Sequence, residues 1–339
     1  MEIKLNEVRI EPVLDSVKRE KISDEEYFSK KYTDYISNSR LKLINPEQGG
    51  SPELYKSGFT GETCTSLIIG NSVHQLLLQK EVFTLGPEIN KPSAKLGQVL
   101  DLVIEYNKTH SLYDSIIKAC KEVQYYANSI DSKRICKIIE SGMEYMFYRK
   151  QHSDPNMLFL SKRDRDVVVN CINKLNNNPQ VTRLLNPSED IHSFNEDAFF
   201  ITFKCSHQNN NCEIKCKMKA DNWTIDLENK IIVLNDLKTT GKLIGQFMQN
   251  SFVKFHYARQ FAFYLYVLLR YCEKEYGYNS EDWRFQCNVI VSETTADNKS
   301  AVFNITKDLL DEGRKEFCNL LKRVACCEMY GYSNKHTFI

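Results

Sequence analysis

Residues 216–240 read CKMKADNWTIDLENKIIVLNDLKTT, and this stretch decides the fold that the sequence predicts. In residues 214–221, apolar and polar side chains alternate strictly, which is typical of a strand with one buried face. Residues 231–238 are apolar and rich in β-branched side chains, which favours a second, buried strand. Residues 222–230 between them are polar, so we expect the chain to turn back there and form a β-hairpin.

The hairpin would bring two carboxylates together, because Asp221 ends the first strand and Asp236 lies near the end of the second. Side chains two residues apart on a strand share a face, so Lys238 is predicted to lie about 7 Å from Asp236 at Cα. Carboxylate oxygens suit Mg²⁺ or Mn²⁺, and an ammonium group stabilises charge on a phosphate. These residues predict metal-assisted cleavage of a phosphodiester, with Asp221, Asp236 and Lys238 in catalytic roles.

An Asp-x-Lys triplet on a strand is more often a solvated edge or an ion pair, and the sequence alone leaves that alternative open. The same spacing recurs at Glu228 and Lys230, within the predicted polar turn. A catalytic group needs rigid support from a regular element, so the pair at Asp236 and Lys238 is favoured over the pair in the turn.

A helix is predicted for residues 252–271. Five of its side chains recur at three- and four-residue spacing and share a face, namely Tyr257, Gln260, Phe261, Tyr264 and Leu268. Gln260 needs a partner on this apolar face, because a buried amide left unpaired costs about 1–3 kcal/mol. A metal-bound water, a DNA phosphate or a loop carbonyl would each provide one, and the sequence does not choose among them.

With these motifs the chain resembles the PD-(D/E)XK nuclease superfamily, and within it the phage-type exonucleases of the RecE and lambda-exonuclease class. The family pattern runs from a basic strand ending in Asp, through a hairpin, to Asp-x-Lys-Thr-Thr and a helix with Gln and Tyr. Here it matches residues 217–221, residues 236–240, Gln260 and Tyr264. Looser likenesses extend over residues 34–332, in segments 36–41, 51–55, 70–78, 160–185, 288–293 and 309–332.

The resemblance implies an α/β fold with a restriction-endonuclease-like core, in which a central mixed sheet is flanked by helices. The implied divisions are an N-terminal extension (1–33), a single nuclease domain (34–332) with a helical part (about 34–190) and a catalytic sheet core (about 191–332), and a tail (333–339). Residues 96–150 are helix-like in pattern and form part of the helical region.

The resemblance also implies a set of metal ligands. Asp221, Asp236 and the backbone carbonyl of Leu237 would hold Mg²⁺, for which Mn²⁺ would substitute. His74 matches a histidine that ligates metal in relatives, although a lone His among leucines is more often a packed core residue. Glu196 fits the spacing of a further acidic ligand, and the neighbouring Asp197 competes with it for that role. Capping the start of a strand is the alternative role for either acid.

Contacts with DNA are expected close to these residues. Lys217 and Lys219 share the predicted strand face of Asp221. A second set of expected contacts consists of Thr239, Thr240 and Tyr257. The net charge of +1 excludes a uniformly basic DNA-coating protein, so contact with DNA must be local.

Departures from the family pattern are modest. Ala220 stands where the superfamily name has proline, and the second acid is Asp rather than Glu. Cysteines after the predicted core, at 272, 287, 318, 326 and 327, lack the spacing of an iron–sulfur cluster, so none is expected. The 12 cysteines and the charged N-terminal residues indicate free thiols in a reducing cytoplasm, and no apolar run is long enough for a membrane span.

The sequence thus predicts a Mg²⁺-dependent exodeoxyribonuclease. By resemblance it would digest double-stranded DNA ends in the 5′ to 3′ direction and leave 3′ overhangs for phage-type recombination. A single-strand annealing protein is a candidate partner, and a homo-oligomeric ring is expected. Two alternatives remain, a nuclease of the same class that serves DNA repair or CRISPR adaptation, and a non-catalytic module that binds DNA ends.

Overall fold

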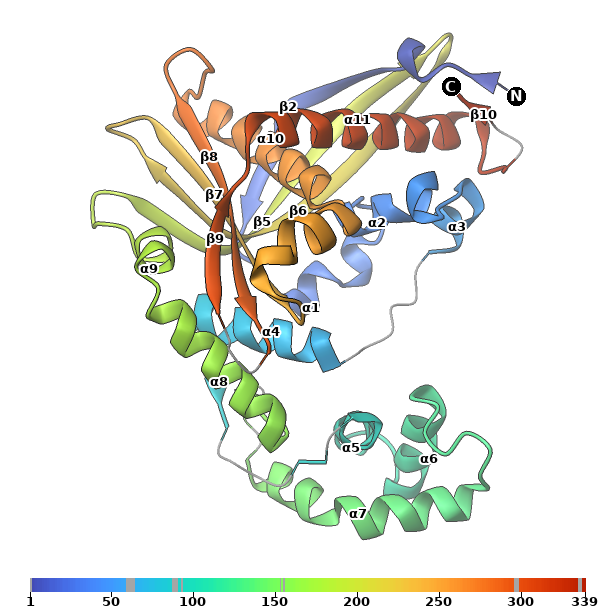
Figure 1. The fold of residues 1–339 in the computed structure, drawn as a ribbon. Coiled ribbons are helices and arrows are strands. Elements are labelled where there is room, and N and C mark those ends of the chain that lie inside the picture. The colour runs from blue at the N-terminus through green and yellow to red at the C-terminus, as the bar shows by residue number, and fades with distance from the viewer. Residues whose placement is uncertain are drawn as a thin grey trace. The chain divides into compact units, whose positions relative to one another are not determined.

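Figure 1 shows the protein as a computed structural model. It describes residues 2–58, 65–86, 91–92, 94–152, 154, 156–295, 299–334 and 337–339. The chain forms two compact units, of which unit 1 holds residues 1–62 and 174–339 and unit 2 holds residues 63–173. The predicted hairpin lies in unit 1.

A six-stranded sheet forms the centre of unit 1, with the strand order β2-β5-β6-β7-β8-β9. Its strands are β2 (Arg9–Glu20), β5 (His192–His207), β6 (Asn210–Asp226), β7 (Ile231–Thr240), β8 (Arg284–Glu293) and β9 (Ser300–Asn304). Neighbouring strands are antiparallel except β7 and β8, which run parallel. The sheet is therefore mixed and flanked by helices, and the fold is α/β.

The hairpin of β6 and β7 is present, with a shorter turn than the sequence predicts. The alternation in residues 214–221 is confirmed, because its four apolar side chains are at most 2% exposed. The polar stretch 222–230 was expected to form the turn, but β6 continues to Asp226. Trp223 and Ile225 prolong the strand because both are fully buried in the core.

Two long helices, α10 (Tyr257–Tyr276) and α11 (Lys307–Tyr330), pack against the sheet (Figure 1). The helix predicted for residues 252–271 begins only at Tyr257. His256, directly before it, has a left-handed backbone with φ of 53°, and Phe247–Phe252 form a π-helix (η6). A left-handed residue interrupts a right-handed helix, and side-chain periodicity does not report it.

The first 62 residues of the chain also contribute to the sheet. Strand β2 pairs with β5 and forms one edge of the sheet, where Pro12 is tolerated because its missing N–H interrupts no central ladder. The remaining elements of unit 1 are α1 (Asp24–Tyr27), α2 (Asn38–Leu41), α3 (Pro52–Ser57), α9 (Pro179–Leu185), the paired strands β1 (Glu2–Ile3) and β10 (Thr337–Phe338), and the 3₁₀ helices η1 (Leu5–Glu7), η2 (Lys30–Tyr32), η3 (Lys42–Ile44), η4 (Pro46–Gln48) and η5 (Ile244–Gln246).

Unit 2 is mainly helical. Its elements are α4 (Thr65–Leu78), β3 (Thr84–Leu85), α5 (Ala94–Tyr106), α6 (Leu112–Glu122), α7 (Asp131–Gln151) and β4 (Met157–Leu158), and α8 (Lys162–Asn176) crosses the boundary between the units. Its core includes Val99, Leu100, Ile116 and Ile138, all fully buried. The helical character predicted for residues 96–150 is confirmed. In the described part of the chain, every helix is too short or too polar to cross a bilayer.

Candidate active site

Asp221 and Asp236 come together where β6 and β7 pair. One carboxylate oxygen of Asp221 accepts a hydrogen bond from the backbone N–H of Leu237 at 2.7 Å. Asp236 directly precedes Leu237 and is buried, with 3% of its surface exposed. The backbone of β7 therefore fixes the Asp221 carboxylate beside the position of Asp236, as the hairpin predicts.

Lys238 supplies a positive charge to this pair. Its Nζ lies 2.5 Å from Oδ2 of Asp236, which confirms that the two side chains share a face of β7. Burial lowers the pKa of Lys238, but the carboxylates of Asp236 and Asp221 raise it by more, so the net pKa lies above its usual value. In the metal-free protein this environment favours the charged form of Lys238, which donates hydrogen bonds.

Gln260 on α10 holds the other oxygen of Asp236. Its Nε2 donates a hydrogen bond to Oδ1 of Asp236 at 2.7 Å. None of the three partners considered from the sequence is the one observed here, because the amide is satisfied by the acid itself. The side chain of Asp236 is therefore fixed from both sides, by Gln260 on Oδ1 and by Lys238 on Oδ2.

Glu196 lies beside Asp221 at an irregular point of β5. Its φ of 54° is left-handed, a conformation that costs a residue with a side chain about 1–3 kcal/mol. The regular pairing of β5 with β6 stops at Glu196 and Asp221 and resumes on both sides of them. A carboxylate oxygen of Glu196 lies within 4.8 Å of one of Asp221. The carboxylate site is defined from here on as Glu196, Asp221, Asp236, Lys238 and Gln260.

Asp197, the competitor of Glu196 in the sequence, has a different environment. It is 1% exposed, and its Oδ2 lies 2.8 Å from Nε of Arg19 and accepts a hydrogen bond from the Trp223 indole at 2.9 Å. Lys21 lies 3.7 Å from its other oxygen. The Asp197 carboxylate is thus engaged in a buried ion pair, whereas Glu196 faces Asp221.

The two lysines expected to contact DNA have partners within the fold. Lys217 is buried, its ammonium donates to the carbonyl of Tyr27 at 2.6 Å, and burial lowers its pKa to about 8, helped by Arg40. Its ammonium is thus enclosed by the protein, and contact of Lys217 with DNA stays a prediction. Lys219 pairs with Glu196 at 3.0 Å and with Asp24. Its contact with DNA stays a prediction.

The remaining candidates in unit 1 lie on β7 and α10. Thr239 is half-buried and Thr240 is buried, with its hydroxyl accepting from the Lys242 N–H at 3.1 Å. The Tyr257 ring lies 5.2 Å from Nζ of Lys238. Tyr264 follows Gln260 by one helical turn, and burial raises its pKa well above the usual value. Roles in DNA contact or catalysis for these residues remain predictions.

His74 lies on α4, within unit 2. The segment 70–78, which resembles the family, is part of this helix. Metal ligation by His74 stays a prediction.

Sequence reasoning missed the asparagines that lie beside the acids. Asn222 follows Asp221 and Asn235 precedes Asp236, and both are only 1% exposed. The available signal was Asn235 itself, since an amide within an apolar strand requires a partner.

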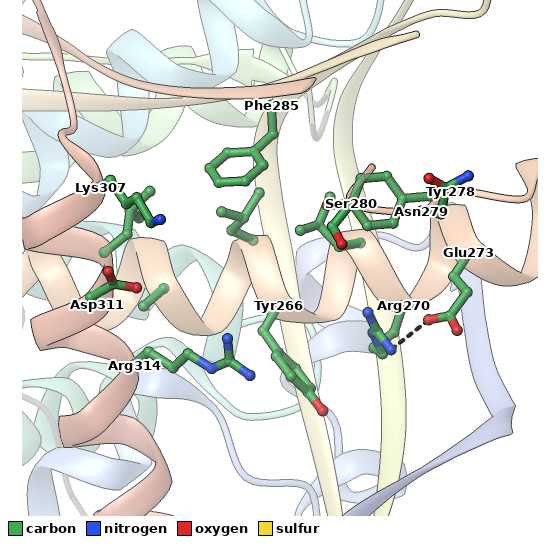
Figure 2. Close-up of a pocket in the computed structure, with 14 residues that line it drawn as sticks. Tyr266, Arg270, Glu273, Tyr278, Asn279, Ser280, Phe285, Lys307, Asp311 and Arg314 are labelled. Atoms are coloured by element: carbon green, nitrogen blue, oxygen red, sulfur yellow. Dashed lines mark ion pairs between the residues drawn. The ribbon is translucent and has the colours of Figure 1, made fainter. Parts of the chain in front are cut away.

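A separate pocket of about 500 Å³ lies in unit 1 between α10, α11 and the start of β8 (Figure 2). Tyr266 and Phe285 stand on its walls, and the guanidinium groups of Arg270 and Arg314 lie 5.7 and 5.8 Å from the Tyr266 ring. Arg270 is paired with Glu273 at 2.5 Å. No residue of the carboxylate site is among those that line this pocket, so the two features are distinct.

Comparison of the sequence with known protein families and with curated proteins finds no match. Comparison of the structure finds similarity to the crystal structure of a Eubacterium rectale protein named "Putative exonuclease". The two chains are 12% identical, the match covers 93% of this chain and 88% of that chain, and the TM-score is 0.47. A function for this protein must therefore rest on the chemistry of its own site.

Proposed function

We propose that this protein is a nuclease that hydrolyses phosphodiester bonds with a divalent cation at the carboxylate site. The observation that carries the proposal is the convergence of Asp221, Asp236 and Lys238 on two paired strands. Carboxylates offer ligands for a hard cation, and a permanent ammonium group offers a charge for a phosphate. The sheet holds these groups on a rigid support, as chemistry at a fixed geometry requires.

The donor set fits a hard divalent cation. Glu196 and Asp221 approach within 4.8 Å through carboxylate oxygens, and Oδ2 of Asp236 is buried with the ammonium of Lys238 2.5 Å away. Oxygen ligands of this kind favour Mg²⁺, with Mn²⁺ as a substitute. These three acids and the Leu237 carbonyl would hold the ion, and the resemblance adds His74. When bound, the ion lowers the pKa of a water molecule and stabilises charge on the phosphate.

Lys238 and Gln260 have separate tasks in this proposal. Lys238 would donate hydrogen bonds from its ammonium to the attacking water or to a phosphate oxygen. The carboxylates of Asp236 and Asp221 raise its pKa in the metal-free protein, so we assign the proton released by the water to a carboxylate or to solvent. Gln260 would keep the Asp236 carboxylate in its orientation through the 2.7 Å hydrogen bond, and Tyr264 would lie near the phosphate.

The substrate and the direction of digestion come from the resemblance. We propose that the enzyme acts on ends of double-stranded DNA in the 5′ to 3′ direction and leaves 3′ overhangs for phage-type recombination. A ring of identical chains and a single-strand annealing partner belong to the same proposal. Lys219, Thr239, Thr240 and Tyr257 would contact the DNA, because each lies on or next to an element that carries the carboxylate site.

The test is digestion of linear duplex DNA in Mg²⁺, labelled separately at its 5′ and 3′ ends, beside a closed circle. Loss of the 5′ label with the circle intact is the expected result. Asp236→Asn and Lys238→Ala should abolish digestion while the protein still folds. Lys230→Gln is the matched control, because Glu228 and Lys230 in the hairpin turn repeat the spacing of Asp236 and Lys238. This variant should digest DNA like the wild type.

Other results would change the conclusion. Cutting of the closed circle would make the protein an endonuclease with the same chemistry. Full activity in Asp236→Asn or Lys238→Ala would refute the site. No cleavage of any substrate by the folded wild type, in Mg²⁺ or Mn²⁺, would favour a module that binds DNA ends without cutting them.

A further inference from the structure

A continuous row of side-chain amides crosses the sheet beside the carboxylate site. We call it the amide row, and its members are Asn195, Asn222, Asn235, Asn288 and Asn304, on β5, β6, β7, β8 and β9. The Asn304 amide donates to Asn288 at 3.3 Å, Asn288 to Asn235 at 2.9 Å, Asn235 to Asn222 at 2.7 Å, and Asn222 to Asn195 at 2.8 Å. Every donor points in the same direction across the sheet.

The amide row follows the backbone pairing of the strands. Each of its hydrogen bonds joins two residues whose backbones are already cross-strand partners. Asn222, Asn235 and Asn288 are each 1% exposed, so water does not compete for their amides. Hydrogen bonds aligned in a chain polarise and strengthen one another. If the strands paired in another register, the buried amides would lose these partners, and no water could replace them.

The proposed metal ligands stand next to this row. Glu196 directly follows a member of the amide row, Asp221 directly precedes one, and Asp236 directly follows one. Because β5, β6 and β7 are successively antiparallel, these three neighbours fall in one adjacent row of the sheet. A change of register in either pairing would separate the acids and break the amide row in the same step.

We propose that the amide row is a register lock for the carboxylate site, and that Asn222 and Asn235 are its positioning residues. This inference rests on the proposed function, since it concerns the placement of the ligands for the ion. A slip of one residue moves every side chain of a strand to the other face. Apolar side chains pack acceptably in several alignments, whereas a single buried amide is known to fix register in other assemblies.

A purely structural role is the competing explanation. In that case the amides would only add to the stability of the sheet, and their loss would act like the loss of any buried side chain. The two explanations predict different behaviour of the Leu237 N–H, which donates to the Asp221 carboxylate at 2.7 Å. This bond exists only when the two strands are aligned, so exchange of its proton with solvent reports the placement of the acids without a metal or a substrate.

The test uses the full chain with ¹⁵N-labelled leucine. Asn235→Leu removes the central amide, and Ile225→Ala is the control, because Ile225 is fully buried in the same hairpin and carries no amide. The measurements are melting temperature, proton exchange at Leu237 relative to Leu268 in the core of α10, and Mn²⁺ affinity by electron paramagnetic resonance. Initial rates of DNA digestion complete the set.

The register lock predicts a local effect in Asn235→Leu. Exchange at Leu237 should accelerate by about tenfold or more relative to Leu268, and Mn²⁺ affinity should fall by about 10- to 100-fold. The kcat should fall while the KM for DNA stays within about twofold. Ile225→Ala should lower the melting temperature but leave the exchange ratio and the Mn²⁺ affinity unchanged.

If Asn235→Leu does not fold, the double variant Asn222→Leu/Asn235→Leu takes its place, since replacing both partners leaves no unpaired amide between these two strands. An unchanged exchange ratio at Leu237 in the folded variant would overturn the register lock, and so would an equal change in Ile225→Ala. A wild type that binds no Mn²⁺ or cuts no DNA would overturn the proposed function alone, because Leu237 exchange still decides the role of the amide row.

Discussion

Glu196 and Asp197 are adjacent in the sequence, and we predict that removing their charges has different consequences. The perturbations are Glu196→Gln and Asp197→Asn, which keep the shape of each side chain and remove one negative charge. Glu196→Gln should abolish cleavage with little effect on folding. Asp197→Asn should destabilise the fold and leave cleavage intact at temperatures where the protein remains folded.

The loss of stability expected for Asp197→Asn follows from the partners of the Asp197 carboxylate. A hydrogen bond to a charged group contributes about 1.5–3 kcal/mol, and breaking a buried ion pair costs about 3–5 kcal/mol. Arg19 keeps 24% of its side chain exposed and stacks 3.9 Å from the Phe194 ring, so it remains partly solvated after the change. We therefore expect a loss of about 2–3 kcal/mol in the free energy of unfolding. The melting temperature should fall by roughly 4–12 °C.

Two opposing effects decide how Glu196→Gln changes the stability of the metal-free protein. Glu196→Gln removes a pair with Lys219 at 3.0 Å, but Lys219 keeps Asp24 as a partner. It also removes the repulsion between Glu196 and Asp221, whose oxygens lie within 4.8 Å. Because the lost attraction and the lost repulsion oppose each other, the free energy of unfolding without metal should change by less than in Asp197→Asn. Cleavage should fall by about 100-fold or more, because a ligand for the ion is lost.

The assay has two parts, performed on the same preparations. Urea or thermal unfolding in EDTA gives stability without a metal, and digestion of end-labelled duplex in Mg²⁺ gives activity. An Asp197→Asn variant as stable as the wild type, or a Glu196→Gln variant that digests DNA at the wild-type rate, would contradict the roles assigned to these two acids. A stable but inactive Asp197→Asn would reverse the assignment of the two acids.

Three further predictions use the same assays. Lys238→Met should destabilise the metal-free protein by about 3–5 kcal/mol, because Asp236 and Asp221 lose their buried counter-charge, and millimolar Mg²⁺ should restore part of the loss in a melting experiment. His74→Ala should raise the Mg²⁺ concentration needed for half-maximal cleavage, and a titration that matches the wild type would leave His74 as a core residue. Lys217 has a pKa of about 8 against 10.5 for its usual value, so its burial penalises the folded state below pH 8 and this penalty fades up to pH 10.5. The stability of Lys217→Met relative to the wild type should therefore be highest near pH 7 and fall by up to ~3 kcal/mol as pH rises to 10.5, as urea unfolding across this range will show.

Local pattern predicted the parts of the site that depend on one strand or one turn. The shared face of Asp236 and Lys238 follows from the two-residue period of a strand, and the 2.5 Å ion pair confirms it. The approach of Asp221 to the same point follows from the hairpin, and the hydrogen bond to the Leu237 N–H confirms that as well. These features need only short-range information, since the strands are consecutive in the chain.

Features set by distant segments could not be predicted in this way. Lys217 is enclosed because α1 brings Tyr27 over it, and the sequence pattern of β6 alone gives no hint of that cover. The partner of Gln260 depends on how α10 approaches β7, and the left-handed backbone of Glu196 is a property of the assembled sheet. Strand β2 pairs with residues far along the chain, so its place at the sheet edge has no local signal.

The charges of the carboxylate site bear on how the proposed divalent cation would bind. Glu196, Asp221 and Asp236 face the ammonium groups of Lys219 and Lys238, and Lys219 is shared with the further carboxylate of Asp24. Among the described residues, these ion pairs bring three buried or half-buried acids of the carboxylate site to two ammonium groups, and buried negative charge is costly unless it is compensated. Because Lys238 occupies Oδ2 of Asp236 in this state, a cation that takes this oxygen as a ligand must share it with the ammonium or displace it. A displaced Lys238 keeps its charge and is free to donate to a phosphate, so ion binding and the placement of Lys238 are coupled. Lys238→Arg, which keeps the charge on a larger group, should then weaken both Mg²⁺ affinity and cleavage, and unaltered Mg²⁺ affinity in that variant would contradict the coupling.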